Sequence, residues 1–110
     1  MGAAEQQLAQ FIADFPTSRI PDEIQHHGKR LLLNNIGVAL YAADHPDINK
    51  MLTVFDEEGG KKRASVVGTG VRTTTLNAAL ANGFLGHYED YDDTHLVTVI
   101  HTASPIFPAA

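Results

Sequence analysis

Residues 82–95 read NGFLGHYEDYDDTH, and the rest of the chain is organised around this segment. Four acidic residues and three of the six His residues lie between His87 and His101. No Lys or Arg accompanies them, because the last basic side chain of the sequence is Arg72. A solvated protein surface usually mixes charges of both signs. Acids and imidazoles without cations therefore favour proton transfer or metal binding over an ordinary surface.

The quoted segment begins inside a predicted helix and ends in a predicted loop. Thr73-Thr74-Thr75 offers hydroxyl groups for an N-cap, and an apolar helical period then covers residues 76–88. Residues 89–94 are polar and should form a loop, which the apolar, β-branched run 96–100 follows. The pair Ser104-Pro105 predicts the start of another helix, with the serine as its N-cap.

Three more helices are predicted upstream from the spacing of apolar residues. They cover residues 3–15, residues 21–43 and a short segment from Ile48 to Phe55. From Leu31 onward, the helix 21–43 carries apolar side chains around most of its circumference, so we expect it to be central and buried on several sides. Gly37 lies inside it at a cost in helix stability, which suggests close contact with a neighbouring helix.

The segment from Ala64 to Gly70 is β-branched and flanked by glycines, which predicts one short extended segment. These glycines do not indicate nucleotide binding, because neither Gly-Lys-Ser/Thr nor a full Gly-x-Gly-x-x-Gly pattern is present. The sequence thus predicts an all-α, mainly helical fold with at most one short extended segment.

Composition narrows the class of protein further. A chain of 110 residues forms one small domain, and its net charge of −5 argues against nucleic acid or an anionic membrane as a partner. The absence of Cys excludes disulfides and thiolate metal sites. No apolar run approaches the ~20 residues that a membrane span needs, and the N-terminus lacks the pattern of a signal peptide. A cytoplasmic location is the default expectation.

The acidic segment permits three interpretations from its residues alone. In the first, Asp90, Asp92 or Asp93 is a buried general acid or base that works with His101. In the second, a divalent metal ion is bound by four side chains, namely Asp92, Asp93, His95 and His101, although their spacing matches no known metal motif. In the third, the acids only cap helix ends and turns. The spacing by itself leaves all three open.

The last third of the chain contains three connected motifs: the run from Asn77 to Gly83, the run from Asp90 to His95, and His101 with Ser104-Pro105. Together they resemble the MmgE/PrpD family, which includes 2-methylcitrate dehydratase, cis-aconitate decarboxylase and iminodisuccinate epimerase. The similarity covers nearly the whole chain. Two features depart from the family pattern: Asn34 stands where an Asp is usual, and residues 96–100 are apolar where several members have a more polar link. The motifs that carry the resemblance are the run from Asn77 to Gly83, His87, the run from Asp90 to His95, His101 with Ser104-Pro105, and Pro108-Ala109-Ala110.

The resemblance implies a helical domain joined to a smaller lid domain, with the active site between them. Residues 1–110 would form the N-terminal part of the helical domain, and its remainder and the lid would lie outside this chain. The resemblance also implies chemistry on di- or tricarboxylates without cofactor or metal, in a homodimer. A lyase like 2-methylcitrate dehydratase, acting in propionate catabolism, is the first expectation. An enzyme like cis-aconitate decarboxylase or iminodisuccinate epimerase is the alternative.

By motif position, the resemblance implies five site residues. We expect His101 to be the general acid or base and Asp90 to orient it or share its proton, which makes these two the catalytic residues. The substrate would be contacted by Thr94, Asp93 and His95, with Thr94 donating a hydrogen bond to a carboxylate. A polycarboxylate also needs cationic partners. Because the segment has none, they should come from outside this chain, which by itself is expected to be inactive.

Overall fold

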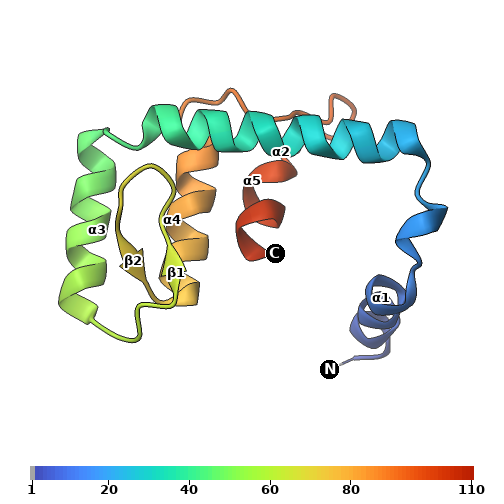
Figure 1. Ribbon diagram of the computed structural model, residues 1–110, viewed down its shortest axis with the longest axis horizontal. Helices are drawn as coiled ribbons and strands as arrows, with labels where there is room; N and C mark the ends of the chain where they lie inside the picture. The colour runs from blue at the N-terminus through green and yellow to red at the C-terminus, as the bar shows by residue number, and fades with distance from the viewer. Residues whose placement is uncertain (1) are drawn as a thin grey trace.

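The computed structural model describes residues 2–110 and confirms the mainly helical fold. Figure 1 shows the longest helix, α2, as a bar along one edge of the molecule, with α3, α4, α5 and a β-hairpin extending from one side of it. Helix α1 lies apart, near the other end of α2. The elements are α1 (Ala3–Asp14), the 3₁₀ turn η1 (Thr17–Arg19), α2 (Asp22–Ala42), α3 (Pro46–Glu58), β1 (Ala64–Ser65), β2 (Arg72–Thr73), α4 (Thr75–His87), α5 (Ala103–Ile106) and the 3₁₀ turn η2 (Phe107–Ala109).

The hydrophobic core lies between the C-terminal half of α2, helices α3 and α4, and the hairpin. Alanines of α2 and α4 allow the two helices to approach closely, and three larger side chains, Ile48, Leu85 and Val66, are fully buried. Burial of each such side chain stabilises the fold by about 1.5–3 kcal/mol relative to exposing it. The core consists of Ala39, Ala42, Ala43, Ile48, Leu52, Phe55, Val66, Ala78, Ala81 and Leu85.

Helix α2 lies along one edge of the molecule, so the expectation that it is central and buried on several sides is wrong for the part of the chain that is described. Its buried residues lie between Asn35 and Ala42, whereas Leu33 is 72% exposed and Tyr41 is 74% exposed. The other elements pack against one face of α2 only. At Gly37, an added Cβ would meet no atom of the described residues within 4 Å, so the close helix contact predicted there is not made.

Helix α1 forms where its apolar spacing predicts it, yet it does not join the core. None of its residues is buried, and the apolar stripe formed by Leu8, Phe11 and Ile12 is exposed. Despite this exposed apolar surface, no helix between residues 2 and 110 has the length and apolar character needed to cross a bilayer.

The predicted extended segment is shorter than residues 64–70 and belongs to a hairpin. Strands β1 and β2 pair antiparallel, with Ala64 opposite Thr73, and the residues between them form the turn. Gly68 in this turn has a φ of 76°. A Cβ at this position would lie 2.6 Å from the Cβ of Ala43 at the end of α2. The hairpin can therefore approach α2 this closely because residue 68 is Gly and has no Cβ.

The Asn-Gly pair of α4 connects this helix to its neighbours. Asn82 accepts a hydrogen bond from the Val67 N–H at 2.9 Å, and its Nδ2 donates to the Ser65 carbonyl at 3.1 Å. These two bonds attach the hairpin to α4. A Cβ at Gly83 would lie 3.1 Å from the Ser104 carbonyl, so α5 also approaches α4 closely. The pair thus positions the hairpin and α5 against α4.

The N-cap predicted for α4 is confirmed, whereas the N-cap predicted for α5 is wrong. Thr74 is the N-cap of α4, as predicted, and accepts a hydrogen bond from the Asn77 N–H at 3.2 Å. Ser104 is not the N-cap of α5, because Thr102 holds that position and Ser104 lies inside the helix. The Ser104 hydroxyl is buried and donates a hydrogen bond to Asp92. A tertiary hydrogen bond has thus overridden the local Ser-Pro signal.

Gly86 is the tightest contact between α4 and α2, and it gives a first testable prediction. A Cβ at Gly86 would lie 2.4 Å from Nδ2 of the buried Asn35 and 3.3 Å from Oγ of Ser104. We expect Gly86→Ala to destabilise the chain by about 1–3 kcal/mol, measured by urea unfolding, because the core must shift to admit the methyl group. The matched control is Gly28→Ala in α2, where a Cβ meets nothing within 4 Å. That change should stabilise the chain by about 0.5–1 kcal/mol, and equal effects of the two changes would contradict the prediction.

Candidate functional site

The end of α4 and the loop after it place the acidic segment beside α2. Helix α4 ends at His87, and the loop turns through Asp90, which has a left-handed φ of 56°. This conformation is uncommon outside Gly, but Asp tolerates it better than most residues. The Tyr91 carbonyl then accepts a hydrogen bond from Nδ2 of Asn34 in α2 at 3.0 Å, which fixes the loop on that helix. The following residue, Asp92, reaches the space between α4 and α5.

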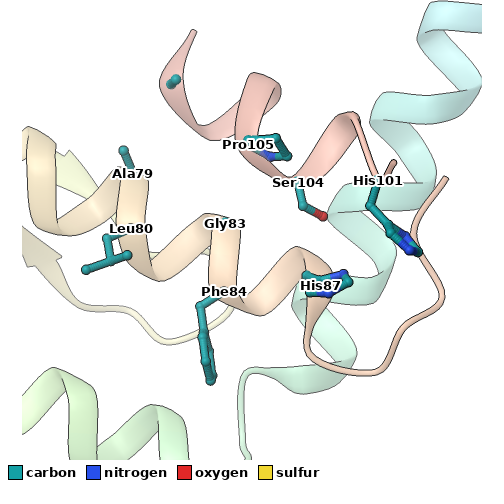
Figure 2. Close-up of a pocket in the computed structure, with 9 residues that line it drawn as sticks. Ala79, Leu80, Gly83, Phe84, His87, His101, Ser104 and Pro105 are labelled. Carbon is teal, nitrogen blue, oxygen red and sulfur yellow. The ribbon is translucent and has the colours of Figure 1, made fainter. Parts of the chain in front are cut away.

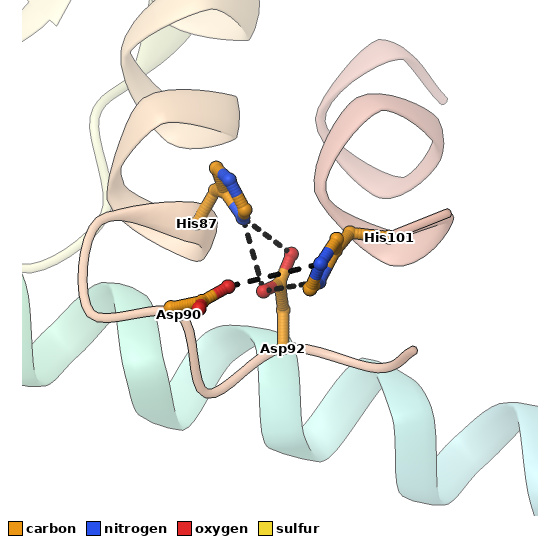
Figure 3. A group of neighbouring side chains, drawn as sticks. All are labelled: His87, Asp90, Asp92 and His101. Carbon is orange, nitrogen blue, oxygen red and sulfur yellow. Dashed lines mark hydrogen bonds and ion pairs between the residues drawn. The ribbon is translucent and has the colours of Figure 1, made fainter. Parts of the chain in front are cut away.

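The Asp92 carboxylate is the centre of a hydrogen-bonded cluster (Figure 3). Its side chain is 0% exposed. Nδ1 of His87 lies 3.1 Å from both carboxylate oxygens, and Nδ1 of His101 lies 3.0 Å from Oδ1. The Ser104 hydroxyl donates to Oδ2 from the opposite side, and Nδ2 of Asn35 lies 3.5 Å from that hydroxyl. One buried carboxylate therefore holds two imidazoles and is itself held by α5.

These contacts set the ionisation of Asp92. Burial by itself would raise the pKa of this carboxyl, but the hydrogen bonds from Ser104 and His87, together with the charge of His87, outweigh burial and lower the pKa below its usual value. Asp92 is therefore a carboxylate at neutral pH. A carboxylate only accepts hydrogen bonds, so each imidazole that bonds to it must carry its proton on Nδ1.

The two histidines adopt related positions around this carboxylate. Their ring centroids are 4.8 Å apart and the ring planes meet at 60°. Because Nδ1 of each ring bonds to Asp92, Nε2 is the nitrogen that points away from this carboxylate. Nε2 of His101 lies 3.7 Å from the carboxylate of Asp90, whose side chain is 76% exposed. His87 is 53% exposed and His101 24% exposed, so both rings remain accessible.

Of the five site residues expected from the sequence, the structure brings three together. His101 is in the cluster, and Asp90 lies at its rim through the contact with Nε2 of His101. Thr94 is at the edge of the cluster, with its hydroxyl 3.5 Å from Nδ1 of His101. Asp92, and not Asp90, is the carboxylate that bonds directly to the imidazoles.

The other two expected site residues point elsewhere. Asp93 accepts hydrogen bonds from the Thr102 hydroxyl and from the Ala103 N–H, the latter at 2.7 Å, so it holds the N-terminus of α5. Burial would raise the pKa of Asp93, but these hydrogen bonds lower it overall. His95 contacts the Thr98 hydroxyl at 2.7 Å within the exposed loop after the acidic segment. The metal-binding set of Asp92, Asp93, His95 and His101 is therefore not assembled among the described residues.

Asp92 and His87 are the two cluster members absent from the expected catalytic and substrate-binding residues. A signal for His87 was present, because its helical period places it on one face of α4 with Leu80 and Phe84. The sequence offered Asp92 as one of three candidate buried carboxylates, alongside Asp90 and Asp93, without choosing among them. The run Asp90 to Asp93 contains three Asp residues, and Asp92 is the one that enters the interior, after the left-handed turn at Asp90 and against the Ser104 hydroxyl.

A cavity of about 450 Å³ opens beside the cluster, between α4 and α5. Figure 2 shows His87, His101 and Ser104 gathered at one end of it, with Leu80 and Phe84 along α4. The cavity is large enough for a small organic acid. None of its lining residues within the described chain is Lys or Arg. The site therefore offers imidazoles for proton transfer but no cation for a carboxylate.

Comparison with known proteins gives a consistent result. The family model described as MmgE/PrpD N-terminal domain matches residues 6–110. A cis-aconitate decarboxylase-like protein, oryM, of Aspergillus oryzae is 27% identical over 108 residues, which are 98% of this chain and 22% of that protein. The chain thus spans about a fifth of the length of this relative. No solved structure matches the chain.

Proposed function

The chain belongs to the MmgE/PrpD family, and from that premise we propose that it supplies the proton-transfer part of a cofactor-independent lyase site for di- or tricarboxylates. The observation that carries the proposal is the hydrogen bonding of two imidazoles, through Nδ1, to one buried carboxylate. This geometry fixes the tautomer of both rings and leaves both Nε2 atoms free to exchange protons with a substrate in the adjacent cavity.

His101 is our candidate for the general base. Its Nε2 would remove a proton from the carbon next to a substrate carboxylate, and the resulting imidazolium would be stabilised by Asp92 at Nδ1 and by Asp90 near Nε2. The ionised state of Asp92 suits this role, because a buried carboxylate favours the charged form of a bonded imidazole. Asp92 replaces Asp90 as the proposed positioning residue, and Asp90 becomes a secondary electrostatic partner.

His87 is our candidate for the general acid. It lines the same cavity as His101, and its ring centre is 4.8 Å from that of His101. In a dehydration, the reaction needs one group to take the carbon-bound proton and a second to protonate the departing hydroxyl. The proposed mechanism requires one of the two rings to be neutral and the other to be protonated. In epimerisation the base would remove the carbon-bound proton and the acid would return one to the same carbon. In decarboxylation CO₂ would depart in place of that proton, and the acid would protonate the carbon.

The remaining substrate contacts belong to the proposal as well. The Thr94 hydroxyl is close enough to His101 to donate a hydrogen bond to a carboxylate bound beside that ring. Asp93 and His95 would support the site indirectly, through α5 and the loop 95–100. Cationic groups for the substrate carboxylates would be supplied by residues outside this chain. A homodimer stays a prediction from the family resemblance, and a cytoplasmic location stays a prediction from the sequence.

Solvent deuterium exchange tests the proposed function without assuming one substrate. The full-length protein is incubated in D₂O with citrate, 2-methylcitrate or cis-aconitate, and NMR follows both exchange of C–H protons and product formation. We expect deuterium to enter next to a carboxylate of one compound, with loss of water or of CO₂. The 110-residue chain alone should show neither activity, because its cavity lacks a cation. Absence of exchange and turnover for every compound by the full-length protein would overturn the assignment to this substrate class.

A further inference from the structure

We propose that the cluster is also a binding site for one divalent transition-metal ion, with His87, Asp92 and His101 as the inner ligands and Asp90 as the fourth. One potential ligand atom from each of these four residues lies within 4.8 Å of all the others. This set differs from the one suggested by the sequence, since it includes His87 and Asp90 in place of Asp93 and His95. The proposal concerns binding and does not make the metal a participant in the lyase reaction.

The distances around Asp92 are close to those of a metal centre. In a tetrahedral site with metal–ligand distances near 2.0–2.1 Å, neighbouring ligand atoms are about 3.3–3.4 Å apart. Oδ1 of Asp92 already lies 3.1 Å from Nδ1 of His87 and 3.0 Å from Nδ1 of His101. An ion bound among these three atoms would take the place of the Nδ1 protons that now join the rings to Oδ1. Asp90, whose exposed carboxylate lies within 4.8 Å of the other three ligand atoms, would complete the coordination.

The surroundings of Asp92 support ligation through one oxygen. The Ser104 hydroxyl donates to Oδ2, whereas Oδ1 faces Nδ1 of His101 at 3.0 Å, and Nδ1 of His87 lies 3.1 Å from both oxygens. The contact of Asn35 with the Ser104 hydroxyl extends this support into α2. Such outer hydrogen bonds orient metal-binding carboxylates in known sites. Two imidazoles and two carboxylates, with no thiolate, suit ions such as Zn²⁺ and Co²⁺ better than soft ions.

Metal binding has a consequence for the rings. An ion bound at Nδ1 displaces the proton held there, and a neutral imidazole then carries its proton on Nε2. That tautomer has no lone pair at Nε2 with which to remove a substrate proton. If the proposed function is correct, Zn²⁺ should therefore inhibit the enzyme at concentrations that fill the site. Only this consequence rests on the proposed function; the binding itself does not.

Calorimetric titration of the untagged full-length protein with ZnCl₂ tests the site. We expect one equivalent to bind, and His87→Ala and His101→Ala each to weaken the affinity at least ~10-fold. Titration with CoCl₂ should give the visible absorption of a tetrahedral Co²⁺ centre. The control is the double variant His26→Ala/His27→Ala, which removes the exposed adjacent histidines of α2 and should leave the affinity unchanged.

Two outcomes would overturn the site: no stoichiometric binding, or binding that His87→Ala leaves intact and the His26/His27 control abolishes. Zn²⁺ binding without inhibition would instead contradict the role proposed for Nε2 of His101 while leaving the metal site standing. Zn²⁺ binding therefore tests the metal site, and inhibition by Zn²⁺ tests the proposed function, so a failure of one can be told from a failure of the other.

Discussion

Replacement of His101 by Ala in the full-length protein is expected to lower kcat by ~10²–10⁴-fold, the range typical of a lost general base. Of the two imidazoles, His101 is the better candidate for the base, because Asp92 faces its Nδ1 and Asp90 faces its Nε2. The thermal stability of the variant should be affected less than kcat, because Asp92 keeps its hydrogen bonds to His87 and Ser104. The measurement is steady-state turnover, together with thermal unfolding to establish that the variant is folded.

Deuterium exchange makes the His101 prediction sharper. If His101 removes the substrate proton, His101→Ala should lose both C–H exchange and product formation. His87→Ala should retain exchange and lose elimination, because only the acid is missing. His26→Ala, which changes an exposed residue of α2, serves as the control and should leave both rates unchanged. A folded His101→Ala variant with normal exchange would exclude His101 as the base.

The helices could be predicted from the sequence because their signals are local. The bounds of α1, α2 and α4 fall within a residue or two of the apolar periods and their caps. The burial of α2 could not be predicted in the same way. An apolar surface indicates that a residue is able to be buried, whereas exposed Leu33 and Tyr41 show that burial also needs a packing partner. Such partners depend on tertiary structure.

The sequence predicted which segment holds the candidate site, but it identified only some of the residues that form it. The excess of acids and imidazoles without cations located the cluster, and His101 is part of it. The sequence could not distinguish the role of Asp90 from that of Asp92. The distinction depends on the left-handed turn at Asp90 and on Ser104 of α5, which lies 12 residues after Asp92. Ser104 illustrates the same limit, since its nonlocal bond to Asp92 replaced the local cap that its position suggested.

This distinction between the two carboxylates leads to the second large expected effect, that of Asp92→Asn. An amide at residue 92 would offer one acceptor in place of two carboxylate oxygens and would present an N–H group to donors that already face it. At least one imidazole would have to change its tautomer or its orientation. We expect kcat to fall by ~10²–10⁴-fold, and the free energy of unfolding to fall by about 1–3 kcal/mol, because a buried hydrogen-bond network is left incomplete.

The matched variant is Asp90→Asn, which changes the exposed carboxylate at the rim of the cluster and should lower kcat less than ~10-fold. Nitrogen-15 NMR of the imidazoles provides a measurement that loss of stability alone would not alter. In the unchanged protein, neutral His87 and His101 should be protonated on Nδ1; in Asp92→Asn at least one should be protonated on Nε2. If Asp90→Asn abolishes turnover while Asp92→Asn keeps it and both tautomers, Asp90 orients the base as the family resemblance implies, and the buried carboxylate is only structural.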